Sequence, residues 1–136
     1  MIEYRLGSKL DAHKVISLYE ASALAEHRPI RNPERMASML ERANLVVTAW
    51  DGEMLIGILR ALSDFAFVTY VSDVAVHTEY QRRGIGKELI RIAQREGGPN
   101  AHIVLLATPK NAEYYQHIGF TLHSSAWILR SYDTVR

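Results

Sequence analysis

Two periods of apolar and polar residues alternate along this chain, and the points where the period changes divide it into elements. A period of two, or an unbroken apolar and β-branched run, is typical of strands. Such segments occur at residues 2–6, 45–50, 54–62, 65–76, 102–107, 120–123 and 126–130. Apolar residues three and four apart are typical of helices. They occur after Asp11, after Asn32-Pro33, over residues 87–95 and over residues 109–117.

The connections between these elements indicate how the strands pair. Asp51-Gly52 is a strong hairpin turn, and a second hairpin is expected at Ser63-Asp64, so three consecutive strands should be antiparallel. The helix 87–95 then provides a right-handed crossover to residues 102–107. Because that last run is apolar throughout, it is expected to be an interior strand.

The element order predicts the fold class. The order is β-α-α-β-β-β-α-β-α-β-β, which indicates an α/β (α+β) fold with a mixed, mostly antiparallel central sheet. Segment 65–76 is too long for one regular strand, so a bend or bulge is expected between Tyr70 and Val74. No internal repeat or low-complexity tract divides the sequence, and residues 1–136 are expected to form a single domain.

Composition excludes several classes of function. Hydrophobic residues make up 48% and charged residues 23%, the net charge is +1, and there is no cysteine. This balance gives no global field for nucleic acid, and the absence of cysteine fits a reducing cytoplasm. No apolar run approaches the roughly 20 residues that cross a bilayer, and no signal peptide is expected at Met1. The six histidines are scattered without metal-ligand spacing, so no metal site is expected.

One stretch concentrates the candidate chemistry: a strand end at Val74-Ala75-Val76, a short loop, and then Gln81-Arg-Arg-Gly-Ile-Gly86 opening a helix. Glycine costs about 0.5–1 kcal/mol in a helix interior, so two within three residues need a reason. A helix N-terminus has unpaired N–H groups and partial positive charge, which suit phosphate, and Arg82, Arg83 and Lys87 add full charges. The stretch therefore predicts an anion cradle.

Two common phosphate-binding loops are excluded by single residues. A Walker A loop requires Ser or Thr after Gly-Lys, but Glu88 follows Lys87. A dinucleotide-binding loop requires a third glycine where this chain has Leu89. A nucleotide-phosphate enzyme is accordingly disfavoured.

The remaining pattern, Gln-x-x-Gly-x-Gly after an Ala-Val strand end, resembles the acetyl-coenzyme A motif (Arg/Gln)-x-x-Gly-x-(Gly/Ala) of the GCN5-related N-acetyltransferase (GNAT) family. The family's element order is also the one predicted here. The resemblance implies that the backbone of the strand end binds the pantetheine arm and that the turn binds the pyrophosphate of acetyl-CoA. The cofactor positions it implies are Val74, Ala75, Val76, Gln81, Arg82, Arg83, Gly84, Ile85, Gly86 and Lys87.

A second motif lies further along the chain. Tyr114-Tyr-Gln-His-Ile-Gly119-Phe120 is similar to the family's Phe/Tyr-Tyr-x-x-x-Gly-Phe, and it aligns Tyr115 with the tyrosine that acts as general acid toward the CoA thiolate. Many members carry an asparagine seven residues before that tyrosine. This chain has Thr108 there and Asn111 four residues before, and either residue is a candidate contact to CoA.

The resemblance implies transfer of an acetyl group from the CoA thioester to a primary amine of a small molecule or protein. The general base is open: Asp73 lies on the relevant strand, with a structural role equally compatible, and a water relay is the alternative. A non-catalytic CoA-binding regulatory module on the same fold is the competing function. His27, Arg28 and Arg31 give a weak hint of an acidic acceptor, and the closing strands or an exposed sheet edge offer a route to a homodimer.

Overall fold

The structure, a computed structural model, describes all of residues 1–136 and divides into two compact units, residues 1–106 and 107–136. The first unit contains a five-stranded sheet in the order β1-β2-β3-β4-β5. Its strands are β1 (Ile2–Leu6), β2 (Leu45–Asp51), β3 (Met54–Ser63), β4 (Val68–Val76) and β5 (His102–Leu105). Strands β1 to β4 pair antiparallel and β5 pairs parallel to β4, which confirms the mixed, mostly antiparallel sheet.

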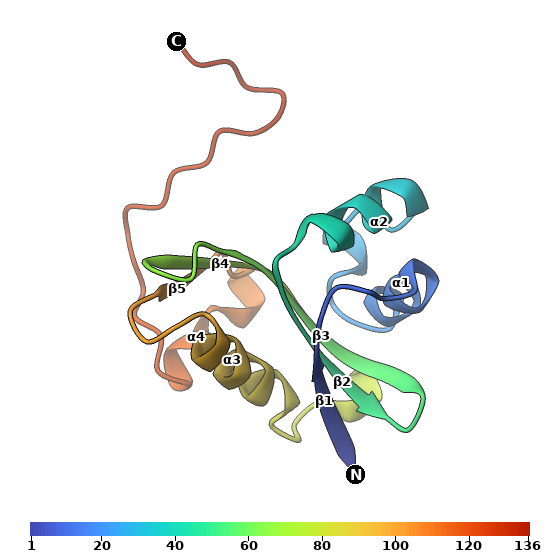
Figure 1. The fold of residues 1–136 in the computed structure, drawn as a ribbon. Helices are drawn as coiled ribbons and strands as arrows, with labels where there is room; N and C mark the ends of the chain where they lie inside the picture. Colours follow the sequence, from blue (N-terminus) through green and yellow to red (C-terminus); the bar gives the residue numbers. More distant parts are fainter. The chain divides into compact units, whose positions relative to one another are not determined.

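Helices cover both faces of this sheet (Figure 1): α1 (Ala12–Glu20) and α2 (Pro33–Arg42) lie on one face, and α3 (Ile85–Glu96) lies on the other. Neighbouring residues of β3 show the two faces, since side chains alternate along a strand. Ile58 packs in one core cluster with residues of α1 and α2. The adjacent Gly57 instead faces Ile85 and Leu89 of α3.

Local sequence explains where the first two helices begin. Asp11 accepts a hydrogen bond from the backbone N–H of His13 and caps α1, and Asn32 caps α2 by accepting from the N–H of Arg35. Pro33 occupies the first turn of α2, where its missing N–H is not needed. Both starts are as the sequence predicts.

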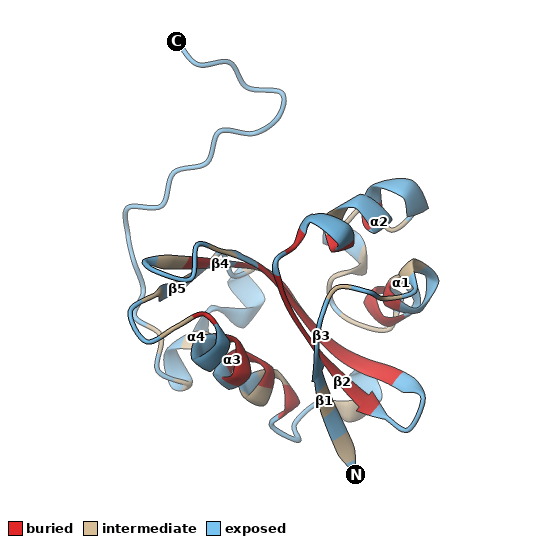
Figure 2. Cartoon of the chain, in the orientation of Figure 1, coloured by how far each residue is buried: buried red, intermediate tan, exposed pale blue.

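The core lies between the sheet and its helices, and burial is densest on β2, β3 and the inner side of α3 (Figure 2). The five apolar residues that α3 buries are Ile85, Leu89, Ile90, Ile92 and Ala93. Their spacing of mostly three and four residues is the one that places side chains on a single face of a helix.

Strand β4 carries the expected bulge. The register with β3 shifts between the pairs Arg60↔Asp73 and Ala61↔Val71, which leaves Ser72 without an opposite residue. The pairing with β5 ends at Val71↔Leu105, immediately before the bulge. Residues 73–76 of β4 therefore have a strand on one side only, and we call them the free edge.

Three expectations about strands are wrong. Strand β4 begins at Val68 rather than residue 65, because Asp64 accepts hydrogen bonds from the N–H groups of residues 66, 67 and 68 and forms a turn there. Strand β5 is an edge strand rather than an interior one. No closing strands form at 120–123 or 126–130, since an isolated two-stranded ribbon has too little burial to be stable.

The second unit contains a short turn of 3₁₀-helix at Pro109–Asn111 followed directly by helix α4 (Ala112–His117). Together they match the helix expected over residues 109–117. Gly119 follows α4 with a φ of 110°, a conformation that favours glycine. The single-domain organisation of residues 1–136 stays a prediction.

Candidate active site

The free edge directs two backbone positions away from the sheet. The N–H of His77 donates to the carbonyl of Ile56 on β3 at 2.9 Å, which sets the alternation along β4. Alternate residues face the same side of a strand, so the backbone groups of Asp73 and Ala75 also face β3. Those of Val74 and Val76 point to the opposite side, where β5 no longer pairs with β4. An extended ligand can pair with these groups as an added strand would.

The helix that follows has unpaired donors at its start. Helix α3 begins at Ile85 with Gly84 as N-cap, and no side chain caps it, unlike α1 and α2. Its first backbone hydrogen bond runs from the N–H of Glu88 to the carbonyl of Gly84, which leaves the N–H groups of Ile85, Gly86 and Lys87 without intrahelical partners. These donors and the helix dipole suit an anion.

The turn that precedes α3, residues 81–84, has unusual backbone conformations. Gly84 adopts a φ of 76° and Arg82, which is not glycine, a φ of 65°. Gly84 has open space around its α-carbon, so glycine is needed there for conformation rather than for close packing. Such strain in a non-glycine residue is typical of functional turns. We call residues 81–87 the cradle.

Side chains attach the cradle to its surroundings. Gln81 donates from Nε2 to the carbonyl of Val76 at 3.2 Å, which links the cradle to the free edge. The Arg83 guanidinium lies 5.0 Å from the ring centroid of Tyr80, and the Tyr80 hydroxyl donates to Asp51 at 2.5 Å. Arg82, Arg83 and Lys87 are exposed and lie within the cradle, so three cations are close in sequence to the unpaired donors.

Most of the chain matches one protein family. A family model described as an acetyltransferase (GNAT) domain matches residues 15–128. The chain belongs to the GNAT acetyltransferase family. GNAT proteins are N-acetyltransferases, and acetyl-CoA is the co-substrate of the family.

Individual relatives agree with this membership. The chain is 28% identical over 122 residues to an uncharacterized N-acetyltransferase ycf52 of Pyropia yezoensis, an alignment that covers 82% of the chain and 68% of the relative. The chain spans only about half the length of several other curated relatives.

Solved structures show the GNAT fold. The chain superposes on a putative acetyltransferase from Deinococcus radiodurans R1 with a TM-score of 0.77 at 23% identity, covering 96% of the chain and 89% of that structure. It also superposes on an aminoglycoside N-acetyltransferase solved in complex with CoA, with a TM-score of 0.73 at 17% identity, covering 97% and 95%.

The residues that the GNAT resemblance assigns fall into both units. Val74 to Val76 and Gln81 to Lys87 lie consecutively in the first unit, on the free edge and the cradle. Tyr115 and Asn111 lie in the second unit. Asn111 is exposed and precedes α4 without capping it, and its N–H donates to the carbonyl of Thr108 at 2.9 Å.

Tyr115 is in an environment that suits a proton donor. It is half-buried, and its ring makes edge-on contacts with Phe120 and Tyr114, at centroid distances of 5.5 and 5.3 Å. Burial raises the pKa of its hydroxyl, with a smaller contribution from Tyr114. Tyr115 therefore carries its proton at neutral pH.

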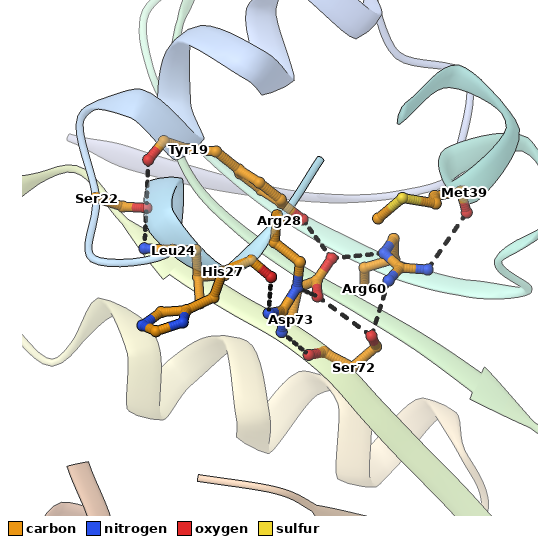
Figure 3. Close-up of polar contacts among 9 residues, drawn as sticks. All are labelled: Tyr19, Ser22, Leu24, His27, Arg28, Met39, Arg60, Ser72 and Asp73. Carbon is orange, nitrogen blue, oxygen red and sulfur yellow. Dashed lines mark hydrogen bonds and ion pairs between the residues drawn. The ribbon is translucent and has the colours of Figure 1, made fainter. Parts of the chain in front are cut away.

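Asp73 is the centre of a buried polar cluster on the α1/α2 face of the sheet (Figure 3). Its carboxylate accepts hydrogen bonds from Tyr19 at 2.6 Å, Arg28 at 2.5 Å and Arg60 at 2.6 Å. Burial alone would raise the pKa of Asp73, but the hydrogen bonds and charges of Arg60, with Tyr19 and Arg28, lower it below its usual range. We call these four residues and Ser72 the Asp73 cluster.

The cluster was not predicted, although the sequence contains a signal for it. Arg60 and Asp73 are the only charged residues in β3 and β4, and the hairpin register brings them opposite each other. Arg28, one of the three residues behind the hint of an acidic acceptor, pairs with Asp73, and the hint itself stays a prediction.

Two features are absent from the structure. No three His, Asp or Glu side chains gather as a metal ion would require. None of the helices is both long and apolar enough to cross a bilayer.

Proposed function

We propose that this protein transfers the acetyl group of acetyl-CoA to a primary amine of a small molecule or protein by direct attack. The observation that carries the proposal is the continuity of the free edge with the uncapped start of α3. Outward backbone groups at Val74 and Val76 are followed, nine residues after Val76, by the first unpaired donor of the cradle at Ile85. That spacing suits one ligand with an extended amide-containing arm and a pyrophosphate.

In this proposal each part of the site binds one part of the cofactor. Val74 and Val76 bind the amides of pantetheine through backbone hydrogen bonds, with Ala75 between them. The N–H groups at Ile85, Gly86 and Lys87 bind pyrophosphate, with charge from Arg82 and Arg83. Gly84 gives the turn its left-handed conformation, Gln81 links it to the strand, and Asn111 or Thr108 is a further contact.

The chemical step needs a neutral amine. An amine with a pKa of about 10.4 is almost entirely protonated at pH 7, so a proton must first leave it. The amine nitrogen then attacks the thioester carbonyl, the C–S bond breaks, and the CoA thiolate takes the proton of the Tyr115 hydroxyl. The new amide nitrogen loses its second proton, which returns through water to the Tyr115 phenolate. The amine's proton leaves through water, because the Asp73 carboxylate is occupied by its partners and has a lowered pKa.

A thiol-release screen tests this function. The protein is incubated with acetyl-CoA and a panel of amines, amino acids and peptide N-termini, and free CoA thiol is measured. Amine-dependent release of thiol is expected, together with a thermal shift with CoA that ATP and NAD do not produce. The absence of a thermal shift with CoA would reject the cofactor site itself.

The alternative is a non-catalytic CoA-binding module. It predicts a thermal shift with CoA but no thiol release with any amine. The half-buried, protonated Tyr115 favours the enzyme, because a binding module has no use for a proton donor. A cytoplasmic location and a homodimer stay predictions, for which fractionation and light scattering are the direct measurements.

A further inference from the structure

The segment between α1 and α2 is attached to β4 at both ends of the free edge. We call residues 21–32 the connector. The carbonyl of Ala21 accepts the N–H of Thr78 at 2.9 Å, just after β4, and Arg28 donates from Nη2 to the carbonyl of Ser72 at 2.7 Å, just before the free edge. The connector therefore spans the free edge, residues 73–76, which includes the outward backbone groups of Val74 and Val76.

The attachment at Ser72 depends on Asp73. Arg28 and Arg60 both donate to the Asp73 carboxylate, and each also donates to Ser72: Arg28 to its carbonyl and Arg60 from Nη2 to its Oγ at 2.8 Å. Ser72 is the bulge residue, at the point where β4 leaves β5. The bulge residue Ser72 is therefore bound by two guanidinium groups, and both groups are held in place by the Asp73 carboxylate.

Burial and charge make this arrangement costly to disrupt. Asp73 is 1% exposed and its side chain contacts α1 through Tyr19, the connector through Arg28 and β3 through Arg60. No buried side-chain donor or acceptor in the chain lacks a partner. A buried carboxylate removed from such a network leaves two guanidinium groups with unpaired charge, which is more costly than losing a surface pair.

We propose that Asp73 is a positioning residue for the cofactor. Its ionised carboxylate holds Arg28 and Arg60 on Ser72, and this fixes both the direction of the free edge and the connector that spans it. The role differs from that of a general base, which would have to release its partners and take a proton. The inference rests on the proposed function, because the free edge is the pantetheine site only if the protein binds CoA.

The test compares two structural aspartates, Asp73 within the free edge of β4 and Asp64 before the start of that strand. Asp73→Asn removes the charge inside the cluster. Asp64→Ala removes the turn-forming carboxylate before the start of β4, far along the strand from the cradle. For each variant, the melting temperature, the dissociation constant for CoA by calorimetry, and kcat and KM with an amine from the screen are measured.

If Asp73 is a positioning residue, the two variants should differ in their affinity for CoA. Asp73→Asn is expected to weaken CoA binding about tenfold or more, because small displacements of binding groups are costly. Asp64→Ala is expected to lower the melting temperature and keep the CoA affinity within about twofold, as independent sites do. The acid limb of the pH profile of kcat/KM should survive in Asp73→Asn.

Two results would overturn the proposal. One is an unchanged CoA affinity in Asp73→Asn with loss of turnover and of the acid limb, which would make Asp73 the base. The other is an equal loss of CoA affinity in both variants, which would mean general destabilisation. If wild-type protein does not bind CoA, the proposed function fails instead, so the two failures are distinguishable.

A milder variant covers the case in which Asp73→Asn does not fold. Arg28→Lys keeps the positive charge but loses the hydrogen bond to the Ser72 carbonyl, and it is expected to weaken CoA binding about threefold or more. Arg31→Lys changes an exposed arginine of the same connector outside the cluster. Equal affinities in these two variants would contradict the proposal.

Discussion

Arg60 and Asp73 lie directly opposite each other on β3 and β4, with the Arg60 Nε 2.6 Å from the Asp73 Oδ2. The Asp73 side chain is fully buried, and that of Arg60 is only 10% exposed. Because a second arginine, Arg28, shares the same carboxylate, the cluster carries one more positive than negative charge. The pair is therefore sensitive to the loss of either member.

Replacing Arg60 with methionine should destabilise the protein strongly. Methionine can replace the aliphatic part of the Arg60 side chain, but Asp73 loses one of its two cationic partners. Breaking a buried ion pair typically costs about 3–5 kcal/mol. We expect the low end of that range, since Arg28 and Tyr19 remain, and urea unfolding gives the measurement. Arg91→Met removes the exposed pair with Glu88 and should cost less than about 1 kcal/mol. If both variants lost the same free energy of unfolding, the buried pair would contribute no more to stability than the exposed one.

Gly57 allows α3 to pack closely on β3. A β-carbon at this position would lie 3.2 Å from the Ala49 Cβ, 3.3 Å from the Ile85 Cγ2 and 3.4 Å from the Leu89 Cδ1. Gly57→Val should therefore cost about 1–3 kcal/mol through overpacking and should also weaken CoA binding, because Ile85 begins the helix of the cradle.

A compensating change distinguishes crowding from other effects of that substitution. Gly57→Ala needs a small displacement, and adding Ala49→Gly removes its nearest neighbour. The double variant should recover CoA affinity relative to Gly57→Ala alone, measured by calorimetry. A double variant that binds no better would show that α3 is not displaced by the added methyl group.

Gly84→Ala tests the left-handed turn of the cradle. A residue with a β-carbon pays about 1–2 kcal/mol in this conformation, and relaxing the strain would turn the donors at Ile85 and Gly86 away from the ligand. Loss of one such hydrogen bond should raise the CoA dissociation constant about fivefold. Gly52→Ala is the matched control, because Gly52 has a φ of 60° and equally open surroundings in the β2–β3 hairpin. The control variant should lose stability but keep its affinity for CoA.

Local patterns were sufficient to predict the elements that form the site. Asp11 and Asn32 mark helix starts whose side chains bond the nearby backbone, and the apolar spacing of α3 fixes its core face. The length of segment 65–76 predicted the bulge. Each of these depends on residues within a few positions of one another, which is why sequence alone sufficed.

Features that depend on distant residues were not predictable in the same way. Tyr19 and Asp73 are 54 positions apart, and only the packing of α1 on β4 brings them together. Nothing in the apolar sequence around Gly57 indicates that α3 packs directly over it. The closing strands fail for a related reason: alternation at 126–130 shows what a strand would bury, but no neighbouring strand pairs with it.

The acid stability of the fold should depend on Asp64. Hydrogen bonds from the N–H groups of Phe67, Val68 and Ala66 lower the pKa of Asp64 to about 2, whereas in an unfolded chain it is about 3.9. A lowered folded-state pKa contributes stability that is present above the unfolded value and lost as pH falls through about 2. Asp64→Asn keeps the acceptor oxygen but cannot titrate, so its stability should fall less between pH 4 and pH 2. Parallel unfolding curves would contradict this assignment.

Tyr115→Phe separates binding from chemistry. The substitution keeps the ring and its edge-on contacts with Phe120 and Tyr114 but removes the proton that the CoA thiolate would take. Turnover should fall about 10²–10⁴-fold, while the CoA dissociation constant and the melting temperature stay near wild type. Tyr114→Phe, one residue earlier and more exposed, is the control and should keep its activity.

The pH profile adds a second measurement to the same comparison. Since burial raises the pKa of the Tyr115 hydroxyl, the wild type should keep its proton donor past the ordinary tyrosine pKa of about 10. Activity limited by this group therefore declines only at still higher pH, and the Tyr115→Phe variant lacks that decline. Unchanged turnover in Tyr115→Phe would remove the residue from the mechanism and leave water to protonate the thiolate.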